Sequence, residues 1–179
     1  MKNTIIKKTL LLIILTFNLS LYAQTDEWQS LNVFTGYNPP CQNVIPRYNY
    51  SLDNILRISL KGNADIVIKL INYYTDACIR YVYISSGDTY EISNIPEGTY
   101  YVKIGFGSDF AIKKDGKYCE AKFLENMSFE KGDDLMDFNV VNNSTGYSVP
   151  SFELQLNVKT RNKKDKFDYH KISEDEFYN

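Results

Sequence analysis

The stretch EISNIPEGTYYVKIGFG, residues 91–107, decides the fold class because it sets a turn between two runs of alternating apolar and polar residues. Pro96 holds its φ at about −65° and Gly98 accepts positive φ, so the chain can reverse between the runs. The second run has one apolar face, made by Tyr100, Val102, Ile104 and Phe106. The stretch therefore predicts a β-hairpin whose second strand is half-buried, with Tyr101 and Lys103 on its wet face.

Similar strand-like runs precede this one, each bounded by Gly, Asn, Asp or Ser. Five runs within about fifty residues leave no room for crossover helices, so we expect antiparallel strands in a sandwich or a barrel, with hairpins between neighbours. The fold class that we predict is all-β, as an antiparallel β-sandwich. The five runs cover residues 55–60, 64–74, 77–84, 88–93 and 99–106.

Residues 151–159, SFELQLNVK, show the cleanest alternation in the chain. This pattern predicts a strand with one wet face and one buried face, the buried side chains being Phe152, Leu154, Leu156 and Val158. The stretch between the clear runs, residues 109–147, mixes short strand candidates with loops, and residues 136–140 are the best of these candidates.

The remaining parts of the chain lie outside the predicted sandwich domain, which spans residues 51–159. Residues 24–50 are rich in turn formers and carry three prolines, so we expect an irregular segment that packs on the domain. Residues 160–179 are charged and nearly free of core residues, which predicts a tail that is mobile or docks late. Within this tail, Ser173 and Glu176 have the spacing of a capping box, which indicates a helix start.

The first 23 residues have the pattern of a secretory signal peptide. Three lysines precede an apolar run of about a dozen residues, and Ala23 ends the run in a small-residue cleavage context. The run is shorter than the roughly 20 residues that span a bilayer. We therefore expect cleavage before Gln24 and export across the inner membrane to the periplasm, the cell surface or the medium, with no transmembrane segment in the mature chain.

The charge and the length restrict the class of protein. The 179 residues include 20 Lys and Arg against 22 Asp and Glu, a formal net charge of −2, and removal of the leader takes away three of the lysines. This acidic balance argues against a dedicated nucleic-acid-binding protein. The mature length is that of about one domain with a single core.

Three cysteines remain in the mature chain, at Cys41, Cys78 and Cys119. In an oxidising compartment we expect one disulfide and one leftover thiol, and three pairings are possible. Cys41 and Cys119 both lie in loop-like sequence, whereas Cys78 opens a β-rich run and suits a small buried residue. We therefore favour a Cys41–Cys119 bond.

The residues that catalysis or metal binding would need are poorly placed. Hydrolytic chemistry needs a histidine held rigidly between a nucleophile and a carboxylate, whereas the single histidine, His170, lies in the polar tail and is expected to be a solvated residue. The acids Asp133, Asp134 and Asp137 lack the spacing of an EF-hand loop, and the cysteines match no zinc motif. The sequence therefore predicts no catalytic residues, no metal site and no cofactor, and we expect that the protein is not an enzyme.

Several blocks of the sequence resemble a known family of secreted β-sandwiches. Residues 79–110, with Gly-Asp before one strand and Ile-Pro-Glu-Gly-Thr-Tyr before the next, resemble transthyretin-like or carboxypeptidase regulatory-like domains of secreted bacterial proteins. Residues 130–140, 146–156 and 172–177 are similar to parts of secreted proteins that carry this domain. The resemblance covers about residues 30–179, and it implies a Greek-key, transthyretin-like or immunoglobulin-like sandwich that serves as a folding aid, a spacer or a surface-interaction module.

Aromatic residues are the remaining unusual feature, with 15 Tyr and 10 Phe in a small chain. Because one core does not require so many rings, we expect some on the surface, where Tyr keeps a wet hydroxyl. The candidates for such a surface are Trp28, Tyr73, Tyr74, Tyr81, Tyr83, Tyr90 and Tyr101. The plainer interpretation is that tyrosine is a strong strand former that covers sheet faces.

Two functions follow from these expectations. The first is a non-enzymatic module of the cell envelope or the extracellular space that binds another protein or takes part in assembly. The second is a carbohydrate-binding module that uses the exposed tyrosines. A row of tyrosines on one flat face would favour sugar, whereas an apolar patch beside an unpaired edge strand would favour protein.

Overall fold

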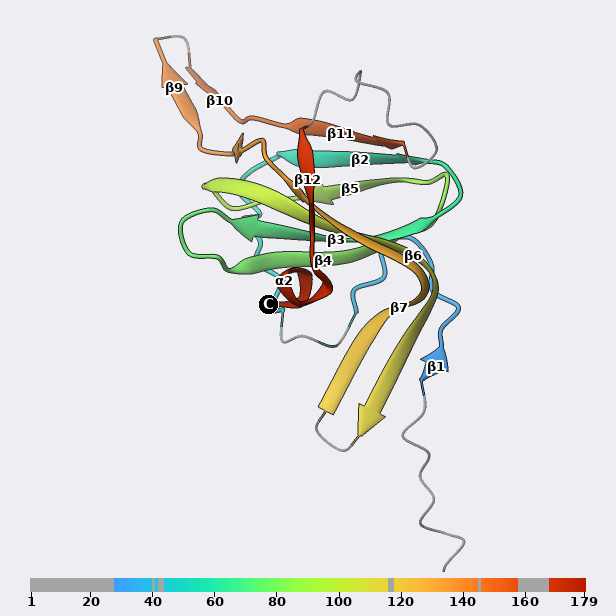
Figure 1. Cartoon of the computed structure of the whole chain (residues 1–179). Helices are drawn as coiled ribbons and strands as arrows, with labels where there is room; N and C mark the ends of the chain where they lie inside the picture. Colours follow the sequence, from blue (N-terminus) through green and yellow to red (C-terminus); the bar gives the residue numbers. More distant parts are fainter. Residues whose placement is uncertain (1–27, 40, 42–43, 116–117, 145, 158–167) are drawn as a thin grey trace, which may run out of the picture.

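Two β-sheets pack face to face in the computed structural model, which describes residues 28–39, 41, 44–115, 118–144, 146–157 and 168–179 (Figure 1). The larger sheet has the strand order β12-β7-β6-β3-β4, and β1 and β8 also pair with β6. The smaller sheet has the order β11-β2-β5. The predicted all-β sandwich is therefore confirmed.

The strands of the two sheets come from all parts of the chain. The larger sheet comprises β1 (Gln29–Ser30), β3 (Asp65–Asn72), β4 (Cys78–Ile84), β6 (Thr99–Asp115), β7 (Tyr118–Gly132), β8 (Met136–Asp137) and β12 (Tyr169–Ile172). The smaller sheet comprises β2 (Ile55–Lys61), β5 (Thr89–Ser93) and β11 (Phe152–Asn157). A separate two-stranded ribbon, β9 (Val141–Asn143) and β10 (Gly146–Ser148), and one short helix, α2 (Glu174–Tyr178), complete the described elements. All strand pairs are antiparallel except β11–β2.

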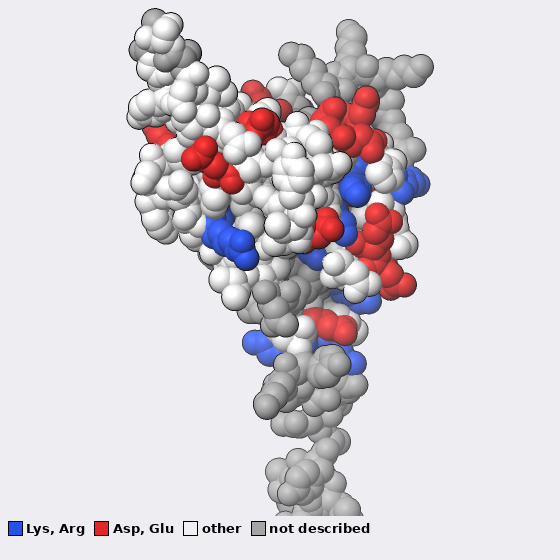
Figure 2. All heavy atoms as spheres, turned by 90° about the vertical axis from the view of Figure 1, so that its left-hand side faces the viewer, with Lys and Arg blue, Asp and Glu red and all other residues white. Residues whose placement is uncertain are grey.

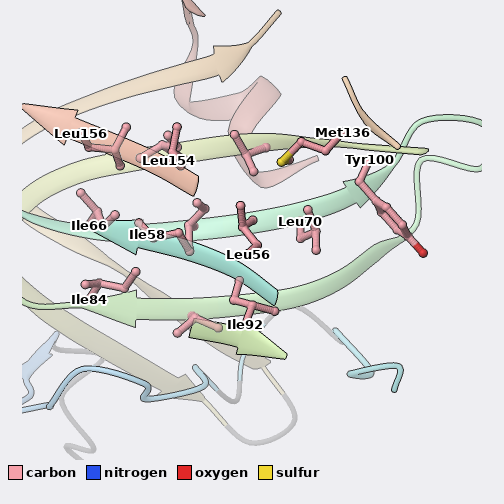
Figure 3. Packing of buried hydrophobic residues seen from close by; sticks show 14 of the residues in the cluster. Leu56, Ile58, Ile66, Leu70, Ile84, Ile92, Tyr100, Met136, Leu154 and Leu156 are labelled. Carbon is pink, nitrogen blue, oxygen red and sulfur yellow. The ribbon is translucent and has the colours of Figure 1, made fainter. Parts of the chain in front are cut away.

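The main core lies between the two sheets and is built from the alternating faces that the sequence predicts. Figure 3 shows how leucines and isoleucines of β2, β3 and β11 meet there. The predicted burial is confirmed for Tyr100, Val102, Ile104, Leu154 and Leu156. Phe152 is only partly buried, and Val158 lies outside the described residues.

The opening stretch forms two strands and a turn, but the predicted hairpin is wrong. β5 pairs with β2 in the smaller sheet, whereas β6 pairs with β3 and β7 in the larger one. The turn between them carries the chain from one sheet to the other, so that both apolar faces reach the same core. Gly98 has a φ of +148° in this turn. Asn54 is fully buried and holds the crossing by accepting from Ile95 N at 2.7 Å and donating to Ile95 O at 2.9 Å.

The prediction of a half-buried β6 is also wrong, because a second core covers the outer face of the larger sheet. Tyr101 and Lys103 are buried on this face. Side chains of β4, β6 and β7 pack there against the N-terminal segment, residues 28–50, and against α2. The domain therefore has two cores, one on each face of the larger sheet, where the sequence indicates one core and wet outer faces.

The end of the chain contributes to this second core. Phe177 of α2 is completely buried, with its ring centroid 5.0 Å from that of Phe129. Ser173 is the N-cap of the helix, and its side chain accepts from Glu176 N at 3.1 Å, as the capping-box spacing indicates. The tail, predicted to be nearly free of core residues, thus contributes Phe177 to the second core.

The longest hairpin of the fold, β6–β7, is missed by the sequence patterns. It extends beyond the sandwich at one end (Figure 1). A register shift between Phe106 and Ser108 interrupts the pairing, and it moves apolar residues to the other face. Gly107 permits close packing at this point, since an added Cβ would lie 2.4 Å from Cβ of Phe123. Residues 105–110, GFGSDF, thus lie inside one long strand although they contain two glycines.

Candidate binding site

The strands β4 and β5 form the edges of the two sheets on one side of the sandwich. The edge of β4 is covered by the N-terminal segment. Gly36 N donates to Tyr83 O and Tyr83 N donates to Tyr37 O, both at 2.9 Å, and Arg47 N donates to Ile79 O at 3.2 Å. This edge therefore has its backbone groups bonded at both ends of the strand.

The hydrogen-bond register of β5 turns every second residue away from β2. At one end Leu60 N donates to Asp88 O at 2.9 Å, and at the other Asn94 N donates to Asn54 O at 3.1 Å. Bonded and non-bonded pairs alternate in an antiparallel ladder. The residues whose backbone groups point outward are therefore Thr89, Glu91 and Ser93.

This outward side of β5 is open over part of its length. In the part of the chain that the structure describes, Asn49 N bonds to Asn94 O beyond the strand, and Arg80 donates to Ser93 O. The described residues provide no hydrogen-bond partner for the backbone groups of Thr89 and Glu91 on this side. Among the described residues, one edge of the sandwich is thus covered and part of the neighbouring one is open.

A small pocket lies between these two edges. It has a volume of about 100 Å³ and is lined by β4, by β5 and by the N-terminal segment. Its lining includes Asn38, Tyr48, Arg80, Tyr90 and Ser93. The pocket and the open edge of β5 therefore share residues.

Arg80 is the charged group at the centre of this arrangement, and only 4% of it is exposed. Its Nη1 donates to Ile79 O at 2.8 Å and to Arg47 O, and its Nη2 donates to Ser93 O at 3.3 Å. The guanidinium carbon lies 3.7 Å from the ring centroid of Tyr48. Burial lowers the pKa of Arg80, as expected when a cation leaves water.

Two exposed tyrosines stack on each other at the pocket. Tyr48 and Tyr50 stack with ring centroids 5.5 Å apart and an interplanar angle of 8°. Tyr48 is 50% exposed and Tyr50 79% exposed, so both rings can contact a ligand. Sequence reasoning missed this pair, although two tyrosines at alternate positions in a turn-rich segment are a usable signal.

The predicted aromatic surface is wrong for three of its members. Tyr81, Tyr83 and Tyr101 are buried, because the N-terminal segment and α2 cover the outer face of the larger sheet. Burial also raises the pKa of Tyr101 to about 12. These rings belong to the second core and are not available to a ligand.

The other predicted rings do not form one surface. Tyr73 and Tyr74 are exposed in the turn between β3 and β4, with centroids 5.2 Å apart. Trp28 is partly exposed beside β1, and Lys122 Nζ lies 5.1 Å from its ring centroid. The β3–β4 turn and β1 lie on opposite sides of the molecule (Figure 1). Tyr90 is partly buried and lines the pocket.

Cys41 and Cys119 form a disulfide, the pairing favoured from the sequence. The bond joins the N-terminal segment to β7. Cys78 is a free thiol that is partly buried, and burial raises its pKa to about 11. Because the thiolate is the reactive form, Cys78 is a poor nucleophile near neutral pH.

The histidine and the acidic residues considered for catalysis are spread over separate contacts. His170 lies on β12, with its Nδ1 2.6 Å from Asp133 Oδ1, and both side chains are half-exposed. Asp134 accepts from Asp168 N, and Asp137 accepts from the backbone and side chain of Asn139. The described residues contain no group of three or more His, Cys, Asp or Glu that could hold a metal ion.

The charges on one face of the molecule are of both signs. On the face shown in Figure 2, acidic and basic side chains lie in small separate groups.

Within the described ranges, no helix is long and apolar enough to cross a membrane. Comparison of the chain with family models, with curated proteins and with solved structures found no match. The function is therefore argued from the site itself.

Proposed function

We propose that this protein is a non-enzymatic binding module of the cell envelope or the extracellular space, and that it binds an extended segment of another protein along the open edge of β5. The observation that carries this proposal is the outward set of backbone groups at Thr89 and Glu91, next to a pocket lined by tyrosines. An unpaired strand edge is a template for one more strand.

The two edges on this side of the sandwich support this choice of occupant. The edge of β4 is bonded to the N-terminal segment at Ile79 and Tyr83, so this segment lies where an incoming strand would have to lie. A strand added beside β5 would donate to and accept from Thr89 and Glu91. Because side chains alternate along a strand, every second side chain of that segment would point toward the pocket. Main-chain bonds would supply affinity, and the pocket would supply selectivity.

A carbohydrate ligand is the second candidate, and the exposed Tyr48–Tyr50 stack is the observation that favours it. Sugar rings pack on exposed aromatic faces. The wider row of tyrosines on a flat sheet face, which would strengthen this candidate, is absent from β4 because Tyr81 and Tyr83 are buried. We therefore favour an extended protein segment over a carbohydrate as the ligand.

The test is a pair of substitutions at one exposed position. Thr89→Pro removes the outward N–H of the open edge, and proline is tolerated at the first residue of an edge strand. Thr89→Val keeps the N–H and is the matched control. Peptides would be selected on the purified mature protein from a displayed random library, and their affinities measured for the wild type and both variants.

We expect Thr89→Pro to lose at least tenfold in peptide affinity and Thr89→Val to stay near wild type, with similar urea melts for both. Bound peptide should also slow hydrogen exchange at the amides of Thr89 and Glu91. Equal affinities for the two variants, with no added protection, would rule out strand addition. Binding on a glycan array that Tyr48→Ala removes and Thr89→Pro leaves intact would establish the carbohydrate candidate instead.

A further inference from the structure

The guanidinium of Arg80 is a buried cation whose counter-ion is missing from the described part of the chain. Buried charges in proteins are ordinarily paired, because a lone ion loses its hydration without compensation. Of the acidic residues that the structure describes, none forms an ion pair with Arg80. A complementary anion from outside the described chain would supply the missing charge.

The contacts that Arg80 does make leave part of its hydrogen-bonding capacity unused. A guanidinium has five N–H donors. The described partners are three backbone carbonyls, two bonded to Nη1 and one to Nη2. Nε and the second hydrogen of Nη2 have no acceptor among the described residues. Two parallel N–H groups are the arrangement that binds a carboxylate with both of its oxygens.

The acid among the described residues that line the pocket, Glu91, is already paired. Glu91 Oε1 accepts from Arg57 Nε at 2.8 Å and from Arg57 Nη2 at 2.7 Å. Its charge is therefore compensated on the outer face of the smaller sheet. The other polar groups of the pocket, Asn38 and Ser93, are neutral. The pocket thus contains one uncompensated positive charge.

The size of the pocket and its position fit a small anionic group. Its volume of about 100 Å³ exceeds what a single water needs. Its wall includes Tyr90, Glu91 and Ser93 of β5, the strand whose open edge would pair with a ligand segment. The Tyr48 ring lies over one face of the guanidinium, and only 4% of Arg80 is exposed, so a charge pair formed there is screened less than one on the surface.

We propose that this pocket is a carboxylate subsite, in which Arg80 binds an acidic side chain or the terminal carboxylate of the segment that pairs with β5. The inference rests on the proposed function for the source of the carboxylate, but not for the chemistry of the pocket. It sets the ligand class as an acidic extended peptide. Tyr48 is the covering ring and Arg80 the group that contacts the ligand.

The first arm of the test uses acetate alone, with chloride at equal ionic strength as the control. Acetate should shift the NMR signals of Arg80 Nε–H and of the Tyr48 ring in a saturable manner, and chloride should not. Arg80→Lys should weaken the acetate-induced shift. Tyr48→Ala leaves Arg80 in place but removes the ring that lies over its guanidinium, so it should alter the affinity for acetate. Absence of a saturable acetate shift in the wild type would overturn the subsite.

The second arm uses peptides selected on the protein and changes only the peptide, so that folding of a variant cannot confuse the result. Glu→Gln or Asp→Asn at one position should weaken binding at least tenfold if a side chain fills the pocket. A C-terminal amide should do so if the terminus fills it. If neither change alters affinity, the proposal is wrong. Acetate binding that persists in Thr89→Pro, while peptide binding is lost, separates this subsite from the strand edge.

Discussion

Lys69 and Lys103 lie directly opposite each other on β3 and β6, and both of their ammonium groups donate to carbonyls at the end of α2. Lys69 Nζ bonds to Phe177 O at 2.8 Å and lies 4.9 Å from the centroid of the Phe177 ring. The last carbonyls of a helix lack partners within the helix and carry partial negative charge. Two lysines on the sheet therefore hold the C-terminal end of the helix.

Replacement of Lys69 should change how stability depends on pH. Burial lowers the pKa of Lys69 to about 8, whereas it stays near its ordinary value in the unfolded chain. The unfolded state therefore binds the proton more tightly, and the contribution of Lys69 to stability rises with pH from about 8 to about 10.5. Urea melts at pH 7 and pH 10 should show the wild type gaining about 1 to 3 kcal/mol relative to Lys69→Met.

The comparison with Lys69→Met is needed because other titrating groups nearby also change the stability with pH, and some of them lower it as the pH rises. Burial raises the pKa of Cys78 to about 11 and that of Tyr81 well above its ordinary value, so both lower stability as pH rises. Burial also raises the pKa of Tyr178, which acts like Cys78 and Tyr81, whereas burial lowers the pKa of Lys103, which acts in the same direction as Lys69. If the difference between wild type and Lys69→Met were constant from pH 7 to pH 10, the native lysine would titrate as it does in water.

Removal of the Phe177 ring should destabilise the whole domain. The side chain is completely buried against Phe129, so Phe177→Ala should cost about 3 to 5 kcal/mol in the free energy of unfolding. Phe34→Ala is the matched control, because Phe34 is 74% exposed, and it should change stability by less than about 0.5 kcal/mol. Equal urea midpoints for the two variants would show that α2 is not part of the folded core.

A side chain at Gly98 should be poorly tolerated. The residue has a φ of +148°, and an added Cβ would lie 3.1 Å from both Asn72 Nδ2 and the Tyr100 hydroxyl. Gly98→Val should therefore destabilise the fold by about 1 to 3 kcal/mol. At the neighbouring position, Glu97→Ala removes an acceptor for Val140 N at 3.0 Å and should cost about 1 kcal/mol. Thermal melts would rank the two, and a larger loss for Glu97→Ala would contradict the backbone argument.

The disulfide should contribute strongly to stability. Cys41 and Cys119 are 78 residues apart in sequence, so the bond restricts a long loop in the unfolded chain. The double variant Cys41→Ser, Cys119→Ser should lose about 3 to 5 kcal/mol. Thiol titration of the denatured wild type should find one reactive group, and Cys78→Ala should find none. Two or more thiols in the oxidised wild type would contradict the pairing.

The strands that alternate cleanly could be predicted from the sequence, whereas their partners could not. Alternation places Tyr100, Val102 and Ile104 on a buried face whatever strand lies beside them. Whether a turn such as that at Gly98 forms a hairpin or crosses between sheets depends on distant strands. Here β2 pairs with β5 and β6 pairs with β3, and the paired residues are 28 to 42 positions apart in the sequence.

The outer core and the candidate site escaped prediction for the same physical reason. Tyr101 and Lys103 alternate with apolar residues and look solvent-facing, but Phe177 and the N-terminal segment cover that face from remote parts of the chain. Arg80 within an apolar strand was the visible signal at the site. The role of Arg80 in the pocket depends on its contact with Tyr48. Tyr48 lies in an irregular segment with no periodic pattern, so this contact could not be predicted.

The bond between Cys41 and Cys119 closes a covalent ring around β2, β3, β4, β5 and β6. A pulling force on the two ends of the chain would pass through this bond and could not stretch the segment inside the ring. The strands that follow Cys119 would be peeled away, while the enclosed strands of both sheets stay tethered at a fixed contour length. Under tension, the open edge of β5 would therefore remain on the mechanically protected part of the molecule.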